Sequence, residues 1–244
     1  AAVILAISGG CVRTIEPAPA VMAPRYPDFV FPAVPAALAS EALAALQERG
    51  WQFLQAGDLG QARRAFSEAL AGSSRFYPAD AGLAYASLAD GNYADAIARF
   101  DRVLRSAPRY VPAMVGKADA HAGAGQVDDA MRLLTEVLGV DPSLAEVRRR
   151  LEVLAFRGQQ DAVRAARQAA DAGRLDESVA AYDRAIATSP DSALLYRELA
   201  AVERRAGRSD AALAHAVRVL GHAHHRGLPV QGRRVAAGQS PARP

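Results

Sequence analysis

The sequence predicts an all-α protein built as a solenoid of repeated helix pairs. Two observations lead to this prediction. First, 51% of the 244 residues are hydrophobic and only 6% are aromatic, and much of the hydrophobic share is alanine. Alanine is the best helix former because it loses no side-chain entropy in a helix. Second, glycines recur at a constant spacing, and a constant spacing is the signature of a repeat architecture.

The repeat appears in four aligned columns of residues. Gly57, Gly91 and Gly125 are 34 residues apart, Gly173 and Gly207 are also 34 apart, and 48 residues separate the two sets. The same spacings hold for an early small residue, a large apolar residue and a closing apolar residue. These columns are Ala62, Ala96, Ala130, Ser178 and Ala212; Phe66, Phe100, Leu134, Tyr182 and Ala216; and Leu70, Leu104, Leu138, Ile186 and Leu220.

Each column has a physical role in a helix pair. Glycine tolerates the positive φ that ends a helix in a tight turn. The small residue lets two helices approach closely, and the large apolar residue four positions later fills the gap between them. A proline starts the next helix, where its missing N–H costs nothing. One pair cannot bury its apolar face alone, so stacked neighbours bury it together.

These segments resemble the tetratricopeptide repeat (TPR). The matching pieces are GDLGQARRAFSEAL, GNYADAIARFDRVLRSAP, GQVDDAMRLLTEVLGVDP, GRLDESVAAYDRAIATSP and GRSDAALAHAVRVL. The resemblance covers an array over about 41–224 and implies a right-handed α-solenoid. The expected repeats are about 43–76, 77–110, 111–144, 159–192 and 193–224.

The array departs from the regular pattern at two places. The closing proline of the first repeat occurs at Pro78, four residues late, which predicts a longer second helix or turn there. A helical insertion of 14 residues, about 145–158, follows the third repeat. Fourteen residues make nearly four helical turns, so we expect one long helix from about 143 to 172. The alternative is a separate helix ending at Gly158, which could split the array into two blocks.

The N-terminus resembles a bacterial lipoprotein signal. Residues 1–10 are apolar and end in small residues directly before Cys11, the only cysteine. The run is too short for a membrane-spanning helix, which needs about 20 apolar residues. The resemblance implies that 1–11 is a signal remnant, that Cys11 is lipidated and that Val12 favours outer-membrane sorting, facing the periplasm. Ser8 departs from the family's usual leucine. The alternative is a buried strand with an incidental cysteine.

Two segments outside the array are expected to be irregular. Residues 12–40 contain six prolines, which favour an extended tether. Its aromatic stretch Tyr26–Pro32 either docks along the array or onto a partner, or is a linker with incidental aromatics. Residues 225–244 are rich in Gly, Pro, Gln and Arg and are predicted to be a disordered tail.

The sequence lacks the motifs of several functional classes. It has no phosphate-binding loop, no His-Glu-x-x-His and no nucleophile elbow, so we predict that the protein is not an enzyme and needs no cofactor. The net charge of +3 comes without a basic stripe, which argues against nucleic-acid binding. His222, His224 and His225 could bind a metal weakly, but a disordered tail with incidental histidines is the favoured explanation, and we predict no metal site.

The predicted role is protein binding through the concave face, which in TPR arrays is formed mainly by the first helix of each repeat. For Trp51 the alternative is packing between tether and helices. Some TPR proteins clamp a C-terminal carboxylate with Lys, Asn and Arg. Here those positions carry Gln47, Trp51, Ala81 and Tyr85, so such a clamp is not expected. Repeat register places these residues on the face: Gln47, Trp51, Gln55, Tyr85, Asp119, Arg167, Asp171, Arg197 and Arg204.

The sequence therefore predicts a lipid-anchored adaptor of the bacterial envelope that holds a protein or peptide of unknown identity. A soluble TPR adaptor is one alternative. A peptidoglycan- or glycan-binding protein is another, because Trp51, Gln47 and Gln55 could supply the aromatic ring and amides of a glycan site.

Overall fold

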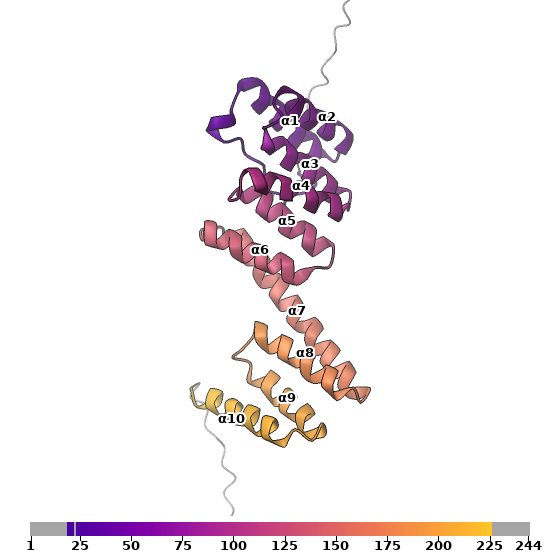
Figure 1. Ribbon diagram of the computed structural model, residues 1–244, viewed down its shortest axis with the longest axis vertical. Helices are drawn as coiled ribbons and strands as arrows, with labels where there is room; N and C mark the ends of the chain where they lie inside the picture. The colour runs from indigo at the N-terminus through magenta and orange to yellow at the C-terminus, as the bar shows by residue number, and fades with distance from the viewer. Residues whose placement is uncertain (1–18, 22, 226–244) are drawn as a thin grey trace, which may run out of the picture. The chain divides into compact units, whose positions relative to one another are not determined.

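The structure is a computed structural model that describes residues 19–21 and 23–225. Within these residues every regular element is a helix, which confirms the predicted all-α class (Figure 1). The short helix η1 is Ala36–Leu38. The others are α1 (Glu41–Ala56), α2 (Leu59–Gly72), α3 (Tyr77–Ala89), α4 (Tyr93–Ser106), α5 (Val111–Gly123), α6 (Val127–Val140), α7 (Ala145–Asp171), α8 (Leu175–Thr188), α9 (Ala193–Arg205) and α10 (Ser209–His225).

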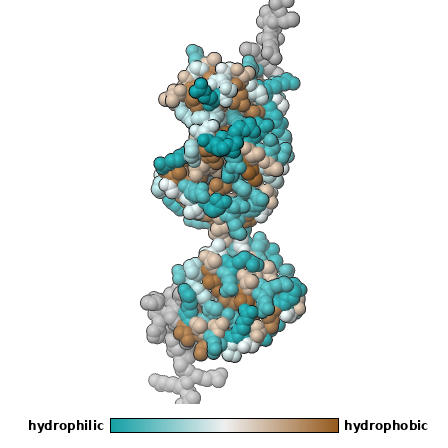
Figure 2. Space-filling model, in the orientation of Figure 1, coloured by the Kyte–Doolittle hydropathy of each residue, from teal (hydrophilic) through white to brown (hydrophobic). Residues whose placement is uncertain are grey.

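The chain folds as two compact units. The N-terminal unit extends to Leu151 and the C-terminal unit begins at Glu152, so the division falls within α7. The expected long helix over about 143–172 is present as the 27-residue α7. On the face that Figure 2 shows, hydrophobic and hydrophilic residues are intermingled on each unit. None of the described helices is long and apolar enough to cross a membrane.

The glycine column ends helices as expected. All five glycines have φ between +74° and +85°. At the first turn, the Gly57 N–H donates to the Leu54 carbonyl and the Asp58 N–H donates to the Phe53 carbonyl. These two bonds satisfy carbonyls that the end of α1 would otherwise leave unpaired. Asp58 then caps α2, because its carboxylate accepts from the Gln61 N–H.

The column of large apolar residues contributes side chains to the core. In the first two repeats, the large residue of the second helix fits against glycines of first helices. A Cβ added to Gly50 or Gly82 would lie 2.6 or 2.5 Å from the Phe66 ring, and one added to Gly116 would lie 2.3 Å from the Phe100 ring. Phe66 and Phe100 are fully buried. Ala216, which holds this column in the last repeat, is exposed, so the column ends before the last helix.

The expectation drawn from Pro78 is wrong. Helices α2 and α4 both have 14 residues, so the first repeat has no longer second helix. Pro78 and Pro112 both lie in the first turn of the following helix, α3 and α5, and they are 34 residues apart. Pro78 is therefore the counterpart of Pro112, and Ser74 occupies the position of the closing Pro108.

The C-terminal unit has its own small core. Ala166 and Ala170 of α7 pack with Val179 and Tyr182 of α8 and with Leu199 of α9. The Ser178 hydroxyl donates to the Ala166 carbonyl at 2.7 Å, which ties α8 to α7. Small alanines on α7 allow this close approach because they add little bulk to the helix surface.

Residues 25–38, here called the strap, do not extend away from the array. Tyr26, Phe29, Val34 and Leu38 pack against the core of the N-terminal unit (Figure 1, indigo). The docking alternative for the aromatic stretch thus describes this part of the chain better than a free tether. Cys11, with the predicted signal remnant 1–11, and the tail 226–244 lie outside the described residues, as do the side chains of His222, His224 and His225.

Candidate peptide-binding surfaces

The strap lies on the first helices of successive repeats, which is the face predicted to be concave. Gln55 of α1 bonds the Tyr26 main chain twice: its Nε2 donates to the carbonyl and its Oε1 accepts from the N–H, each at 3.1 Å. The Gln47 Nε2 donates to the Pro32 and Pro78 carbonyls, both at 3.1 Å. These bonds hold the strap backbone in the way that the edge of a β-sheet holds an added extended peptide.

Aromatic rings of the strap pack on aromatic rings of the helices. Phe29 lies 5.0 Å from Tyr85 of α3, and Phe31 lies 5.5 Å from Trp51 of α1, measured between ring centroids. Trp51 and Tyr85 meet edge to face at 5.5 Å, and Tyr26 stacks on Phe29 at 4.9 Å. Such pairs add about 0.5–1.5 kcal/mol each beyond the area they bury.

The far end of this face carries an ion pair that also reaches the strap. The Arg150 guanidinium of α7 donates to both carboxylate oxygens of Asp119 of α5, at 3.0 and 3.2 Å, and to the Asp28 carbonyl. Burial raises the pKa of Asp119 to about 6, against the opposing effect of Arg150. The Tyr110 hydroxyl donates to the Ala33 carbonyl at 2.7 Å, which fixes the strap beside η1.

The structure thus changes the reading of the predicted N-terminal site residues. Gln47, Gln55 and Tyr85 are buried and bound to the chain itself, so a partner cannot touch them while the strap is in place. Trp51 packs between the strap and α3, as the packing alternative stated. The amide nitrogens of Gln47 and Gln55, which the glycan hypothesis uses, both donate to strap carbonyls. Asp119 is engaged by Arg150 rather than facing solvent freely.

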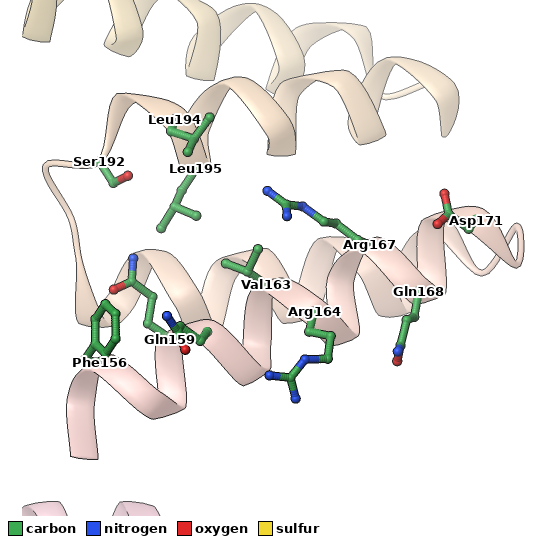
Figure 3. Close-up of a pocket in the computed structure, with 11 residues that line it drawn as sticks. Phe156, Gln159, Val163, Arg164, Arg167, Gln168, Asp171, Ser192, Leu194 and Leu195 are labelled. Carbon is green, nitrogen blue, oxygen red and sulfur yellow. The ribbon is translucent and has the colours of Figure 1, made fainter. Parts of the chain in front are cut away.

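The C-terminal unit carries an open groove between α7 and the start of α9, with a volume of about 580 Å³. Val163 of α7 points toward Leu194 and Leu195 of α9, whereas Arg164 and Gln168 point away from α9 (Figure 3). Phe156, at one end, is 60% exposed and Leu194 is 47% exposed. The large hydrophobic side chains most exposed among the described residues all belong to this unit: Val153, Phe156, Leu194, Leu213 and Val217.

Of the four site residues predicted in the C-terminal unit, Arg167 and Asp171 line this groove, whereas Arg197 and Arg204 do not. Arg167 lines it and forms a two-point contact with Glu198 of α9, at 2.7 and 3.1 Å. The Tyr182 hydroxyl donates to the same carboxylate, and burial with this contact raises the tyrosine pKa to about 12. Asp171 lies at the other end of the groove from Phe156 (Figure 3). Arg197 and Arg204 are exposed on α9 but do not line the groove.

The filled face and the open groove are equivalent in the repeat. In the repeat register, the positions of Gln47, Trp51 and Gln55 in the first repeat are taken by Val163, Arg167 and Asp171 in the C-terminal unit. The position of Pro78 is taken by Leu194. In the N-terminal unit, Pro32 of the strap is buried where Gln47 bonds both its carbonyl and that of Pro78. The groove between Val163 and Leu194 is therefore the same place in the fold, with no described strap upon it.

Sequence analysis missed Val163, Leu194 and Phe156, and it missed Arg150. Phe156 carried a usable signal, because it is the only aromatic residue between Tyr110 and Tyr182 and it lies off the apolar series of the long helix. The others had no comparable signal. An aliphatic residue on a helix is normally predicted to belong to the core. Only the packing of α7 on α9 shows that Leu194 stays at the surface.

The helix pairs define a helical-repeat protein, and one face of its N-terminal unit holds an extended segment of the same chain. Tetratricopeptide repeat models match residues 53–109 and 87–153, and a further one matches 163–221, together about two thirds of the chain. The chain therefore belongs to the tetratricopeptide repeat family, whose members are typically adaptors rather than enzymes. A comparison with curated proteins finds no match to the sequence.

Several solved structures are similar in fold. MamA, residues 41 to the end, from Desulfovibrio magneticus RS-1 shares 17% identity and a TM-score of 0.42, covering 77% of this chain and 98% of that chain. The first TPR of Spaghetti (RPAP3) bound to HSP90 peptide SRMEEVD shares 16% identity and a TM-score of 0.45, covering 49% and 94%. The first TPR domain of human RPAP3 shares 16% and 0.45, covering 47% and 91%.

Proposed function

We propose that the protein is an adaptor whose α7–α9 groove binds an extended peptide of a partner protein. One observation carries the proposal: the equivalent face of the N-terminal unit already holds an extended segment, with Pro32 buried at the corresponding place. The expected occupant is a segment with a proline or branched aliphatic side chain. That side chain would lie between Val163 and Leu194, and its removal from water would supply the driving force.

The flanking polar groups give the groove an orientation for such a peptide. Gln159 and Gln160 line the groove together with Phe156, and their side chains carry amides of the kind that Gln47 and Gln55 use to bond strap backbone. The Gln159 Oε1 already accepts from the Ser189 hydroxyl at 3.1 Å, so its Nε2 would be the group that bonds the peptide. Arg167 is held in place by Glu198, so a fixed ion pair borders the groove. Fixed side chains lose less entropy when a ligand binds, which favours affinity.

A photo-crosslinker placed at Leu194 in cells is expected to capture a discrete partner, and Val163→Asp in the same chain should abolish the capture. The substitution puts a charge into the apolar part of the groove, where its desolvation opposes binding. The control carries the crosslinker at Leu213, which is also exposed but lies on α10. Equal capture at Leu213, or capture that survives Val163→Asp, would refute a groove-specific adaptor.

We further propose that this adaptor is attached to the bacterial envelope through lipid on Cys11, on the outer membrane and facing the periplasm. The support is the apolar run with small residues before the only cysteine. Several acyl chains give stable anchoring, whereas one chain is marginal.

Cys11→Ala should therefore move the protein from the membrane to the soluble fraction when cells are fractionated. A Ser40→Ala variant, altered beyond the signal-like segment, should stay with the membrane. If the Cys11→Ala protein remains membrane-bound, the lipid-anchor proposal fails. If the unmodified protein is already found in the soluble fraction, the soluble adaptor replaces the anchored one. The groove proposal is unaffected by either result.

A further inference from the structure

The strap has the properties of a bound ligand rather than of core structure. It lies outside the helix pairs, and its rings Tyr26, Phe29 and Phe31 are only half-buried. Side chains of the repeats, chiefly Gln55 and Gln47, form hydrogen bonds with its backbone. Core residues of the helix pairs, such as Phe66 and Phe100, are by contrast fully buried.

The contacts define a ligand pattern. Gln55 requires a free N–H and carbonyl at the first aromatic residue, Tyr26. Phe29, three residues on, packs on Tyr85, and Phe31 packs on Trp51. Pro32 follows directly and is fully buried. A segment with aromatic residues at the first, fourth and sixth positions and proline at the seventh would satisfy the same surface.

We propose that this face of the N-terminal unit is a second peptide-binding surface, that the strap is its resident occupant, and that a partner segment with the same aromatic–proline pattern binds by displacing it. The strap ends at Leu38 and α1 begins at Glu41, so the two are joined by a very short connection. Such a connection gives an effective concentration of the order of millimolar. The surface therefore stays closed to weak ligands and opens only to a segment that competes strongly or is locally concentrated.

The test uses the full chain and a fluorescein-labelled peptide of its own residues 24–35 as the probe. In the strap variant, Tyr26→Ser with Phe29→Ser, the resident occupant is weakened, and the probe should bind at least about tenfold more tightly than to the unmodified chain. Adding Gln55→Leu to the strap variant should abolish that gain, because the two backbone bonds to the probe are lost. Leu194→Asp, in the other groove, should leave probe binding unchanged, which separates this proposal from the α7–α9 adaptor.

A second measurement does not depend on the strap variant folding. Trypsin cleaves after arginine, and Arg25 directly precedes Tyr26 of the strap. The Arg25 main-chain N–H donates to the main-chain carbonyl of Gln55 at 2.8 Å. Saturating unlabelled probe should accelerate cleavage at the Arg25–Tyr26 bond of the unmodified chain several-fold, whereas a scrambled peptide should not. The proposal is overturned if cleavage is unchanged at saturation, or if a folded strap variant binds the probe no more tightly than the unmodified chain.

Discussion

Replacing Phe100 by alanine is expected to lower the free energy of unfolding of the N-terminal unit by about 3–5 kcal/mol. The ring is fully buried, lies 5.1 Å from Tyr85 and fills the space that Gly116 leaves open. Its removal would leave a cavity between two successive repeats, where α3, α4 and α5 meet. Helices on both sides are too constrained by their neighbours to collapse into that space, so the loss should approach the upper end of the range.

Urea unfolding followed by tryptophan emission measures this change in one unit. Trp51 is the only tryptophan and belongs to the N-terminal unit, whereas circular dichroism reports helices of both units. The matched control is Phe156→Ala, because Phe156 is the same residue type but 60% exposed, and surface changes stay within about 0.5 kcal/mol. Indistinguishable Trp51 transitions for the unmodified chain and Phe100→Ala would contradict the packing described for the repeats.

Gly116→Ala should destabilise the unmodified protein by about 1–3 kcal/mol, although alanine favours helices more than glycine does. The added Cβ would lie 2.3 Å from the Phe100 ring, and a ring packed inside the core cannot swing aside. In the Phe100→Ala background the space is free. There the same substitution should stabilise the unit by about 0.5–1 kcal/mol, which is the helix preference of alanine over glycine.

A double-mutant cycle with Trp51 emission tests this change of sign. Gly158→Ala is the matched control: Gly158 is also within a helix, but a Cβ there would meet no atom within 4 Å. That substitution should raise the stability of the C-terminal unit, seen by circular dichroism. If Gly116→Ala costs the same with and without Phe100, the close approach of α5 to that ring is not what requires glycine.

Much of the helical framework could be predicted because its rules act over short distances in the sequence. Each glycine of the column ends a helix through its own φ, and each small residue lies on the helix that it allows to approach. The long helix α7 followed from an insertion of nearly whole turns, which keeps the apolar side on one face. Pro78 was misread because a proline can close one repeat or begin the next, and only the equal lengths of α2 and α4 decide between them.

The sequence could predict which face the candidate site residues share, but it could not predict which of them are accessible to a partner. Register alone placed Gln47, Gln55 and Tyr85 on the first helices, yet nothing local indicates that residues 25–38 cover them. Their hydrogen bonds join residues 15 to 31 positions apart in the chain. The pairing of Arg150 with Asp119, 31 residues away, is of the same kind.

The sequence by itself therefore determined the repeat, its helices and the face that the first helices share, because these depend on backbone preference and on a spacing repeated along the chain. Only the tertiary structure decided that the strap fills this face in the N-terminal unit and that the equivalent groove of the C-terminal unit is open among the described residues. That outcome depends on competition for one surface between the chain's own segment and solvent. In the N-terminal unit, aromatic rings and backbone bonds favour the strap, whereas no described segment lies on Val163 and Leu194 in the groove of the C-terminal unit.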